Sequence, residues 1–291
     1  MKTTVPSSKE FAQLLKASHR AIRFSSVMCF SSATLVGAIL AGSLMSLRAV
    51  WLLLFSVFMT AFGFAVNDLS DIELDRASNV LRNPVSTGEL SLKKCIVLSL
   101  SLLIVSLVAL LFLSLWNQLL GLVVGFIYFT YSWTIRAKAR PVLDITYHGL
   151  CLAILATMGY IEFRSFDVNC FLFASLVFLL SVVSQILQEV RDYETDREAI
   201  TTTVTLLGKS ASLILSLAFL VISSAIFLLL LFYAVFPLTI LLLFPLAYFI
   251  VTPILRALHS KDNEERVQKE IGEKRLILIG ASIVILVLGK I

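Results

Sequence analysis

Nine stretches of mostly apolar residues alternate with polar segments along the chain. Each stretch approaches the length of a bilayer-crossing helix, which needs roughly 20 apolar residues. The pattern therefore predicts nine membrane-spanning helices. We place them at residues 24–42, 51–66, 95–112, 119–133, 142–160, 170–187, 213–231, 236–255 and 276–288.

The composition indicates the same class of protein. Hydrophobic residues make up 58% of the 291-residue chain and charged residues only 15%, whereas soluble domains contain about 25% charged residues. Only helices and closed barrels satisfy the backbone hydrogen bonds within lipid, and these stretches are long enough for helices. We therefore expect an all-α integral membrane protein whose single transmembrane domain spans residues 1–291.

Basic residues concentrate on one side of this predicted bundle. With a cytoplasmic N-terminus, only Arg48, Arg164 and Lys290 of the 24 Lys and Arg residues fall on the opposite side, which leaves 21 in cytoplasmic segments. Positive charge collects on the cytoplasmic loops of membrane proteins. We therefore expect a multi-pass protein, in the cell membrane if prokaryotic, with both acidic segments cytoplasmic. Topology also explains the pI of 9.1, so the charge indicates no nucleic-acid partner.

The acidic residues cluster in two segments that match each other. Residues 67–76 and 188–197 align without gaps at an offset of 121 positions, after the second and the sixth predicted span. An internal match of this kind predicts that one half of the bundle repeats the other. The matched pairs are Asp68 with Glu189, Asp71 with Asp192, Glu73 with Glu194, Asp75 with Asp196 and Arg76 with Arg197.

Helical spacing decides which of these acids share a face. At 100° per residue, positions i, i+3 and i+7 fall within about 60° of one another. Carboxylates crowded on one face repel one another unless a cation neutralises them, and hard oxygen ligands suit Mg²⁺. We therefore expect two acidic faces that each hold Mg²⁺ and share a polyphosphate, with Glu73 and Glu194 solvated or paired with a nearby Arg. The two faces are Asp68, Asp71 and Asp75, and Glu189, Asp192 and Asp196.

Both motifs resemble those of the UbiA superfamily of intramembrane prenyltransferases. Residues 67–75 (Asn-Asp-x-x-Asp-x-x-x-Asp) are similar to the first aspartate-rich motif of that family, and residues 192–196 (Asp-x-x-x-Asp) to the second. Residues 82–88 are similar to the segment that follows the first motif, and residues 131–140 to a Tyr-Ser and basic stretch after the fourth helix. The resemblance implies two pseudo-repeated four-helix halves plus a ninth helix around a central cavity.

The resemblance also implies an activity. Family members transfer a prenyl group from a prenyl diphosphate to a lipophilic acceptor in a Mg²⁺-dependent reaction within the membrane lipid. The acceptor is an aromatic quinone precursor, an isoprenoid glycerol ether lipid, or a carotenoid or porphyrin type of molecule. The implied metal ligands are Asp68, Asp71, Asp75, Asp192 and Asp196, and the implied substrate contacts are Asn67, Arg82, Tyr131, Arg136, Lys138, Glu189, Lys209 and Arg23.

An ionisable pair near the start of the fifth span forms another candidate site. Asp144 and His148 are four residues apart and therefore lie on one helical face. Ionisable residues within a span indicate function. Two roles are open: binding or deprotonating the acceptor, or an Asp–His hydrogen bond that orients the basic segment.

Some features depart from the family pattern and keep alternatives open. Gln188 and Glu189 stand where a strict repeat of the first motif has Asn-Asp, and the first helix offers His19, Arg20 and Arg23 instead of an Arg-Pro pair. A membrane terpene cyclase that uses a prenyl diphosphate alone is one alternative, and a membrane transporter is another. The polar segments of about 68–94 and 189–210 are expected to fold as caps over the metal sites.

Overall fold

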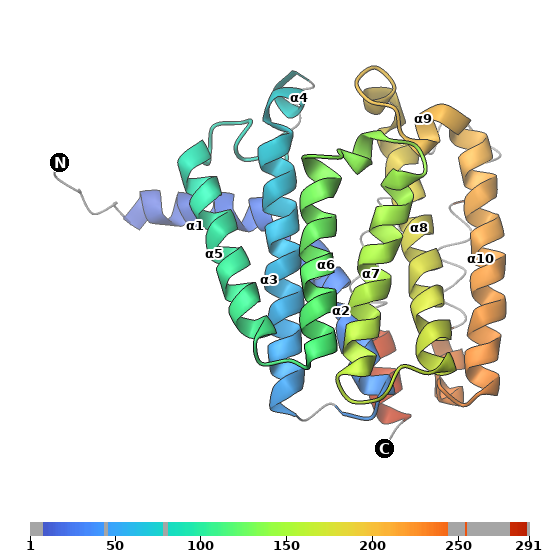
Figure 1. Cartoon of the computed structure of the whole chain (residues 1–291). Coiled ribbons are helices and arrows are strands. Elements are labelled where there is room, and N and C mark those ends of the chain that lie inside the picture. The colour runs from blue at the N-terminus through green and yellow to red at the C-terminus, as the bar shows by residue number, and fades with distance from the viewer. Residues whose placement is uncertain (1–7, 44–45, 78–80, 244–253, 255–279, 290–291) are drawn as a thin grey trace.

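The computed structural model describes residues 8–43, 46–77, 81–243, 254 and 280–289. These residues form an all-α structure in which long helices run side by side as a bundle (Figure 1). The elements are α1 (Ser8–Ile22), α2 (Phe24–Leu40), α3 (Leu47–Ser70), α4 (Ile72–Ala77), α5 (Leu92–Leu110), α6 (Leu115–Ser132), η1 (Ala137–Ala139), α7 (Leu143–Ile161), α8 (Val168–Asp196), α9 (Thr203–Leu207), α10 (Lys209–Phe232) and η2 (Leu238–Leu243).

Seven of the nine predicted spans coincide with helices, namely α2, α3, α5, α6, α7, α8 and α10. The predicted eighth span lies mostly outside the described residues, whereas residues 280–288 of the predicted ninth are helical. By length and apolar character, α3, α5, α8 and α10 qualify as membrane spans, and a fifth arises if the bent pair α1–α2 is one span. The all-α membrane architecture is therefore confirmed, whereas the count of nine and the internal repeat stay predictions.

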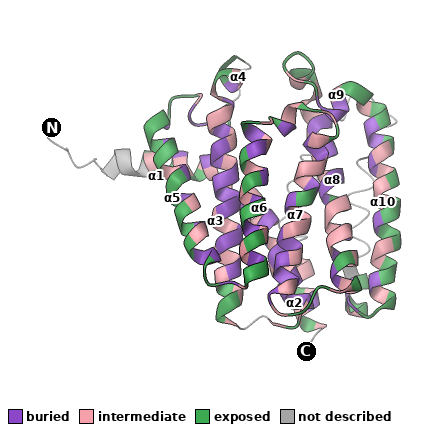
Figure 2. Cartoon of the chain, in the orientation of Figure 1, coloured by how far each residue is buried: buried purple, intermediate pink, exposed green. Residues whose placement is uncertain are grey.

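The bundle places apolar side chains on both its inside and its outside. Its inner helix faces are buried, whereas the outer faces of α5 and α10 are exposed (Figure 2). Those outer faces still carry large apolar residues, among them Val97 and Ile104 on α5 and Val221 and Leu228 on α10. Apolar side chains exposed around a helix bundle are typical of a surface that meets lipid.

The helices α2 and α7 are in close contact. A Cβ atom at Gly159 would lie 2.1 Å from the carbonyl oxygen of Thr34, and one at Gly37 would lie 2.3 Å from that of Ala156. Only glycine allows the two backbones to approach this closely. The contact fixes the last turns of α7 against the last turns of α2.

The helix α1 lies across the bundle rather than along it (Figure 1). The sequence pattern did not predict this helix. Its buried residues Ala17 and Ala21 pack against Val85, Leu90 and Cys95, which belong to the segment between α4 and α5 and to the start of α5. The N-terminal helix therefore supports the polar segment that follows the first acidic motif.

Candidate active site

The first acidic motif lies where α3 ends and α4 begins. Asp68, Asp71 and Asp75 are all buried, at 0%, 7% and 7% exposure. The expected continuous helix through the motif is wrong, because α3 ends at Ser70 and Asp71 caps it with a non-helical φ of −105° and ψ of 8°. A short α4 then restarts the helix, and the Asp75 N–H donates to the Asp71 carbonyl. The acidic face is therefore bent at its central residue.

Two cations from other helices hold the carboxylates of this motif. Arg23, between α1 and α2, forms an ion pair with Asp68. Lys138, in η1, donates from Nζ to Asp71 Oδ1 at 2.5 Å, to Ser70 Oγ at 2.8 Å and to Asn67 Oδ1 at 3.2 Å. Both residues were predicted as substrate contacts, and the structure places both against the motif.

Asn83 joins the two ends of the first motif, a role that the sequence did not reveal. Its Nδ2 donates to the Asp68 carbonyl oxygen at 2.9 Å and to Asp75 Oδ2 at 2.7 Å, and its side chain is fully buried. Its Oδ1 accepts the N–H groups of Val85 and Ser86. One amide therefore fixes the first motif to the segment that follows it.

The second motif lies on the last turns of α8, which continues without a break to Asp196. Asp192 forms a two-point ion pair with Arg191, with oxygen–nitrogen distances of 2.5 and 2.6 Å. Glu194 points elsewhere, as predicted, and pairs with Arg197 at 3.1 Å and Lys209 at 3.0 Å. The segment around Glu189 is thus helix rather than cap loop, and the cap begins after Asp196.

Arg82 is near enough to both motifs to interact electrostatically with each. Its exposed side chain interacts electrostatically with Asp75 of the first motif and with Asp192 of the second. Asp71 and Asp196 are also close enough to interact with each other. Arg136, another predicted contact, is exposed and neighbours Lys138. The two motifs therefore lie near each other at the same end of the bundle, the upper end in Figure 1.

Asp144 and Glu189, both predicted as substrate contacts, have partners in the second cap. Asp144 is fully buried and accepts hydrogen bonds from the N–H and, at 2.5 Å, the hydroxyl of Thr203. Glu189 is 5% exposed, accepts the Val204 N–H at 3.4 Å and lies against Asp144. Because these partners belong to α9, the two acids tie the second cap to α7 and α8.

A row of aromatic residues leads from Asp68 into the bundle. The Arg23 guanidinium lies 5.2 Å from the Phe64 ring centre, and Phe64 contacts Phe30 at 5.7 Å. Phe30 contacts the His148 ring at 5.0 Å, and His148 Nδ1 lies 2.8 Å from Ser181 Oγ. His148 therefore faces α8 and α2, whereas Asp144 faces the second cap, so the two residues of the expected pair have different partners.

Tyr131, expected to contact the substrate, lies beside these groups. Its hydroxyl is 3.5 Å from Gln185 Nε2, which also donates to Glu189 Oε1 at 3.0 Å. The neighbouring Ser132 donates to Asn67 Oδ1 at 3.3 Å. The end of α6 thus touches the first motif through Ser132. Tyr131 is connected to Glu189 of the second motif through Gln185 of α8.

Burial changes the ionisation of the groups at the polar end. Burial raises the pKa of Asp75, against the opposing effect of the Asn83 hydrogen bond. Burial also lowers the pKa of Lys138, although the adjacent Asp71 carboxylate favours the charged ammonium. Both shifts indicate a site that is partly withdrawn from water, where charges interact strongly.

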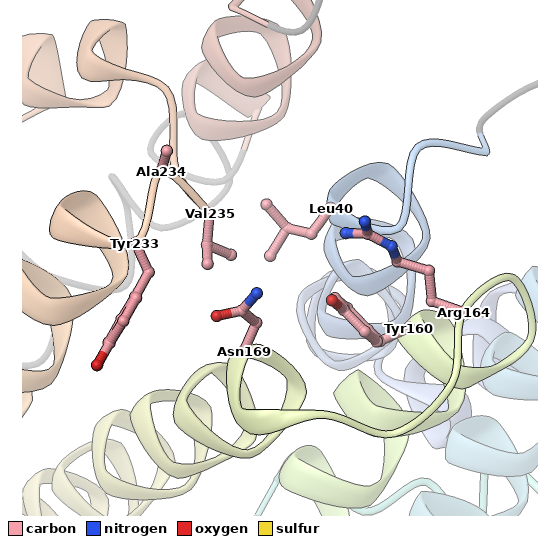
Figure 3. Close-up of a pocket in the computed structure, with 7 residues that line it drawn as sticks. All are labelled: Leu40, Tyr160, Arg164, Asn169, Tyr233, Ala234 and Val235. Carbon is pink, nitrogen blue, oxygen red and sulfur yellow. The ribbon is translucent and has the colours of Figure 1, made fainter.

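The central cavity implied by the family resemblance stays a prediction. One cavity, of about 330 Å³, lies at the end of the bundle opposite the acidic motifs. Figure 3 shows its lining, with Leu40 from α2, Tyr160 from α7, Asn169 from α8 and Val235 after α10. This cavity is separate from the two acidic motifs.

Comparison with protein families decides what kind of protein carries this site. Residues 30–271 match the model of the UbiA prenyltransferase family. The chain belongs to the UbiA prenyltransferase family. Among curated UbiA relatives, the digeranylgeranylglyceryl phosphate synthase of Methanosphaera stadtmanae is 26% identical over 142 residues, 48% of this chain and 50% of that protein. The 4-hydroxybenzoate octaprenyltransferase of Francisella tularensis subsp. novicida is 31% identical over 109 residues, 36% of this chain and 38% of that protein.

These alignments span half or less of each curated relative. Solved UbiA structures match over more of the chain. A UbiA homologue from Archaeoglobus fulgidus bound to GPP and Mg²⁺ has a TM-score of 0.73 at 24% identity, covering 93% of this chain and 99% of that one. The apo structure of a UbiA homologue from Aeropyrum pernix K1 has a TM-score of 0.73 at 18% identity, and the match covers 90% of this chain and 98% of that one. The UbiA fold is therefore shown.

The donor groups of the site suit a hard divalent cation. The buried Asp68 Oδ2 has no hydrogen-bond partner among the residues that the structure describes. The other groups of the motif are carboxylate and amide oxygens, the ligands that Mg²⁺ prefers. The part of the chain that the structure describes contains no ready cluster of three His, Cys, Asp or Glu around one point. The residues thus fit Mg²⁺ chemically, with Arg23 and Lys138 neutralising the same carboxylates in this structure.

Proposed function

We propose that this chain transfers a prenyl group from a prenyl diphosphate to a lipophilic acceptor within the membrane, releasing diphosphate. The observation that carries the proposal is the convergence of two acidic motifs on Arg82 at one end of an apolar bundle. Carboxylates and a cation that face one region match a magnesium–diphosphate headgroup, while the apolar helices match a prenyl chain.

Each side chain has an expected part in this reaction. Asp68, Asp71 and Asp75 would hold one Mg²⁺, and Asp192 and Asp196 would hold another. When bound, Mg²⁺ neutralises diphosphate and so improves it as a leaving group. Arg82 and Lys138 would contact the remaining diphosphate oxygens, assisted by Arg136 and by Asn67.

The aromatic row would receive the prenyl group. Phe64 and Phe30 follow the Arg23–Asp68 pair into the bundle, and the faces of aromatic rings stabilise nearby cations. His148, which contacts Phe30 and Ser181, is our candidate for the acceptor side, where it would orient a polar group of the acceptor or take its proton. Tyr131 would donate a hydrogen bond to the leaving group from its position beside Gln185.

Lys209 has a smaller part in this proposal than its sequence position indicates. Its Nζ contacts Glu194 and lies 5.1 Å from the centre of the Tyr193 ring, so it stabilises the start of α10 and the end of α8. The proposed orientation keeps both motifs and the N-terminus cytoplasmic, in agreement with the positive-inside bias of the sequence.

The acceptor class rests on the relatives alone. Their names are those of a glycerol ether lipid enzyme and a 4-hydroxybenzoate enzyme, so an isoprenoid glycerol ether lipid and an aromatic quinone precursor are the first acceptors to examine. An assay would combine the purified chain, Mg²⁺, prenyl diphosphates of several lengths and both acceptor classes, with products identified by mass.

The proposal predicts a prenylated acceptor and free diphosphate, both lost when EDTA removes divalent cations. A cyclised hydrocarbon formed without any acceptor would instead indicate a terpene cyclase. Release of neither diphosphate nor product from any prenyl diphosphate would contradict the proposal, and cation-coupled uptake into vesicles would then favour a transporter.

A further inference from the structure

Val142 has a backbone conformation that β-branched residues rarely adopt. Its φ is 72° and its ψ is −42°, immediately before α7. Arg136 also has a positive φ, of 50°. The segment 136–142, which we call the basic segment, therefore begins and ends with residues in unfavourable conformations. Such conformations persist only where surrounding contacts enforce them, and they are found most often at functional sites.

The contacts at the two ends of the basic segment reach different motifs. Near its start, Lys138 donates to Asn67, Ser70 and Asp71 of the first motif. At its end, the Val142 N–H donates to Thr203 Oγ1 at 2.7 Å. Only three residues separate Lys138 from Val142, so these two contacts are mechanically connected.

The interior of the basic segment is compact enough to transmit a displacement. Ala137 is fully buried, and the segment forms a 3₁₀ turn in which the Ala139 and Arg140 N–H groups donate to Arg136 and Ala137 at 2.9 and 3.1 Å. A short turn of this kind with a buried anchor has little freedom to absorb a change at one end.

Thr203 is itself held by Asp144. Its hydroxyl donates to Asp144 Oδ1 at 2.5 Å, and its N–H donates to Asp144 Oδ2. Asp144 is fully buried and Thr203 is 3% exposed. Because the Thr203 hydroxyl donates to Asp144 while its oxygen accepts the Val142 N–H, one side chain connects the second cap to the strained residue.

We propose that Thr203 and Asp144 are positioning residues for diphosphate binding, which hold the basic segment so that Lys138 stays against the first motif. This inference rests on the proposed function, because the ligand that Lys138 and the first motif would bind is the prenyl diphosphate. Without the Thr203 hydroxyl, Val142 relaxes to a favourable conformation and Lys138 moves away from Asp71.

The test compares five variants of the full chain with the wild type in detergent or nanodiscs. Thr203→Val removes the hydroxyl and Thr203→Ser retains it. Thr157→Val is the matched control, since the Thr157 hydroxyl donates to Ala153 at 2.8 Å near the end of α7 opposite Val142. Lys138→Gln removes the ammonium group that Thr203 is proposed to position, and it is tested alone and combined with Thr203→Val. The probe is geranyl diphosphate with Mg²⁺, and the readout is its equilibrium Kd.

We expect Thr203→Val to weaken binding about tenfold, the effect of losing one hydrogen bond to a charged group. Thr203→Ser and Thr157→Val should stay within about twofold of the wild type. Lys138→Gln should weaken binding in the wild type but have little further effect in the Thr203→Val background, because both changes remove the same contact. Equal binding by Thr203→Val and wild type, or independent effects of the two substitutions, would overturn the inference.

A second measurement needs no ligand and separates this inference from the proposed function. Hydrogen exchange of the basic segment should become faster in Thr203→Val than in Thr203→Ser and Thr157→Val, with the rest of the bundle unchanged. Unchanged exchange in residues 136–142 would overturn the positioning role, whatever the chain binds. Faster exchange in a chain that binds no prenyl diphosphate would overturn the proposed function and the diphosphate part of this inference, leaving the mechanical link intact.

Discussion

Arg23 and Asp68, 45 positions apart in the sequence, form an ion pair in the first acidic motif. Arg23 has a left-handed φ of 50°, where the chain bends by 45° between α1 and α2. The bend directs the guanidinium at a carboxylate that is fully buried. The conformation of one residue therefore connects the crossing helix α1 to the first motif.

Removing Arg23 should leave an uncompensated buried charge. We expect Arg23→Ala to lower the free energy of unfolding by about 3 kcal/mol, the cost of breaking a buried pair from one side. Arg20→Ala is the matched control: Arg20 pairs with Glu89 at 2.9 Å, the two side chains being 32% and 46% exposed, and solvent-accessible pairs contribute at most about 1 kcal/mol. Chemical unfolding in detergent measures the free energy of unfolding of both variants. Equal losses for the two variants would contradict the importance of the buried pair.

Lys138 should make diphosphate binding sensitive to alkaline pH. Burial lowers its pKa below the ordinary lysine value of 10.5, so the ammonium loses its proton at a lower pH than a free lysine. We expect the Kd for prenyl diphosphate to rise as pH increases through that lowered pKa. Lys138→Arg should move this alkaline limb upward, because a guanidinium stays charged. Identical pH profiles of Kd for the wild type and Lys138→Arg would exclude Lys138 as the titrating group.

Asn83 should be essential for the shape of the first motif. Asn83→Asp replaces the donor to Asp75 with a like charge, and we expect a loss of about 1–3 kcal/mol in unfolding free energy. Exchanging the pair, Asp75→Asn with Asn83→Asp, restores a donor opposite an acceptor and should recover most of that stability without recovering activity. An exchanged pair as unstable as Asn83→Asp would show that the 2.7 Å contact does not control local stability.

Gly159 should tolerate no side chain. The Thr34 carbonyl oxygen would lie 2.1 Å from a Cβ there, so Gly159→Ala forces α2 and α7 apart, and we expect a loss of at least about 2 kcal/mol. Among the described residues, nothing lies within 4 Å of such an atom at Gly280, so Gly280→Ala should be neutral or slightly stabilising in a helix. Thermal unfolding of the two variants decides this, and similar midpoints would contradict the close approach of α2 and α7.

The parts of this molecule that follow from local pattern were predictable. Apolar run length located α3, α5 and α8, and helical spacing separated Glu194 from the acids of the second motif, as its pairing with Arg197 and Lys209 confirms. Spacing failed at Asp71, where the helix breaks. A periodicity argument assumes a continuous helix and carries no information about where tertiary contacts interrupt it.

Partners distant in sequence could not be predicted. Asp144 and His148 share a face by spacing, but α9 and α8 supply their actual partners, Thr203 and Ser181. The role of Asn83 was equally hidden, since an asparagine in a polar segment ordinarily indicates a turn. These contacts depend on which segments the fold brings together, 59 positions apart for Asp144 and Thr203.

The central claim is that the two acidic motifs bind one magnesium–diphosphate group together. Its most direct test is the Mg²⁺-dependent Kd for a prenyl diphosphate in the wild type, Asp71→Asn, Asp192→Asn and Glu194→Gln, the last a control on the same helix but off the acidic face. We expect either aspartate substitution alone to weaken binding at least about tenfold, with Glu194→Gln unchanged. Wild-type affinity in Asp71→Asn or in Asp192→Asn would contradict a site shared by both motifs.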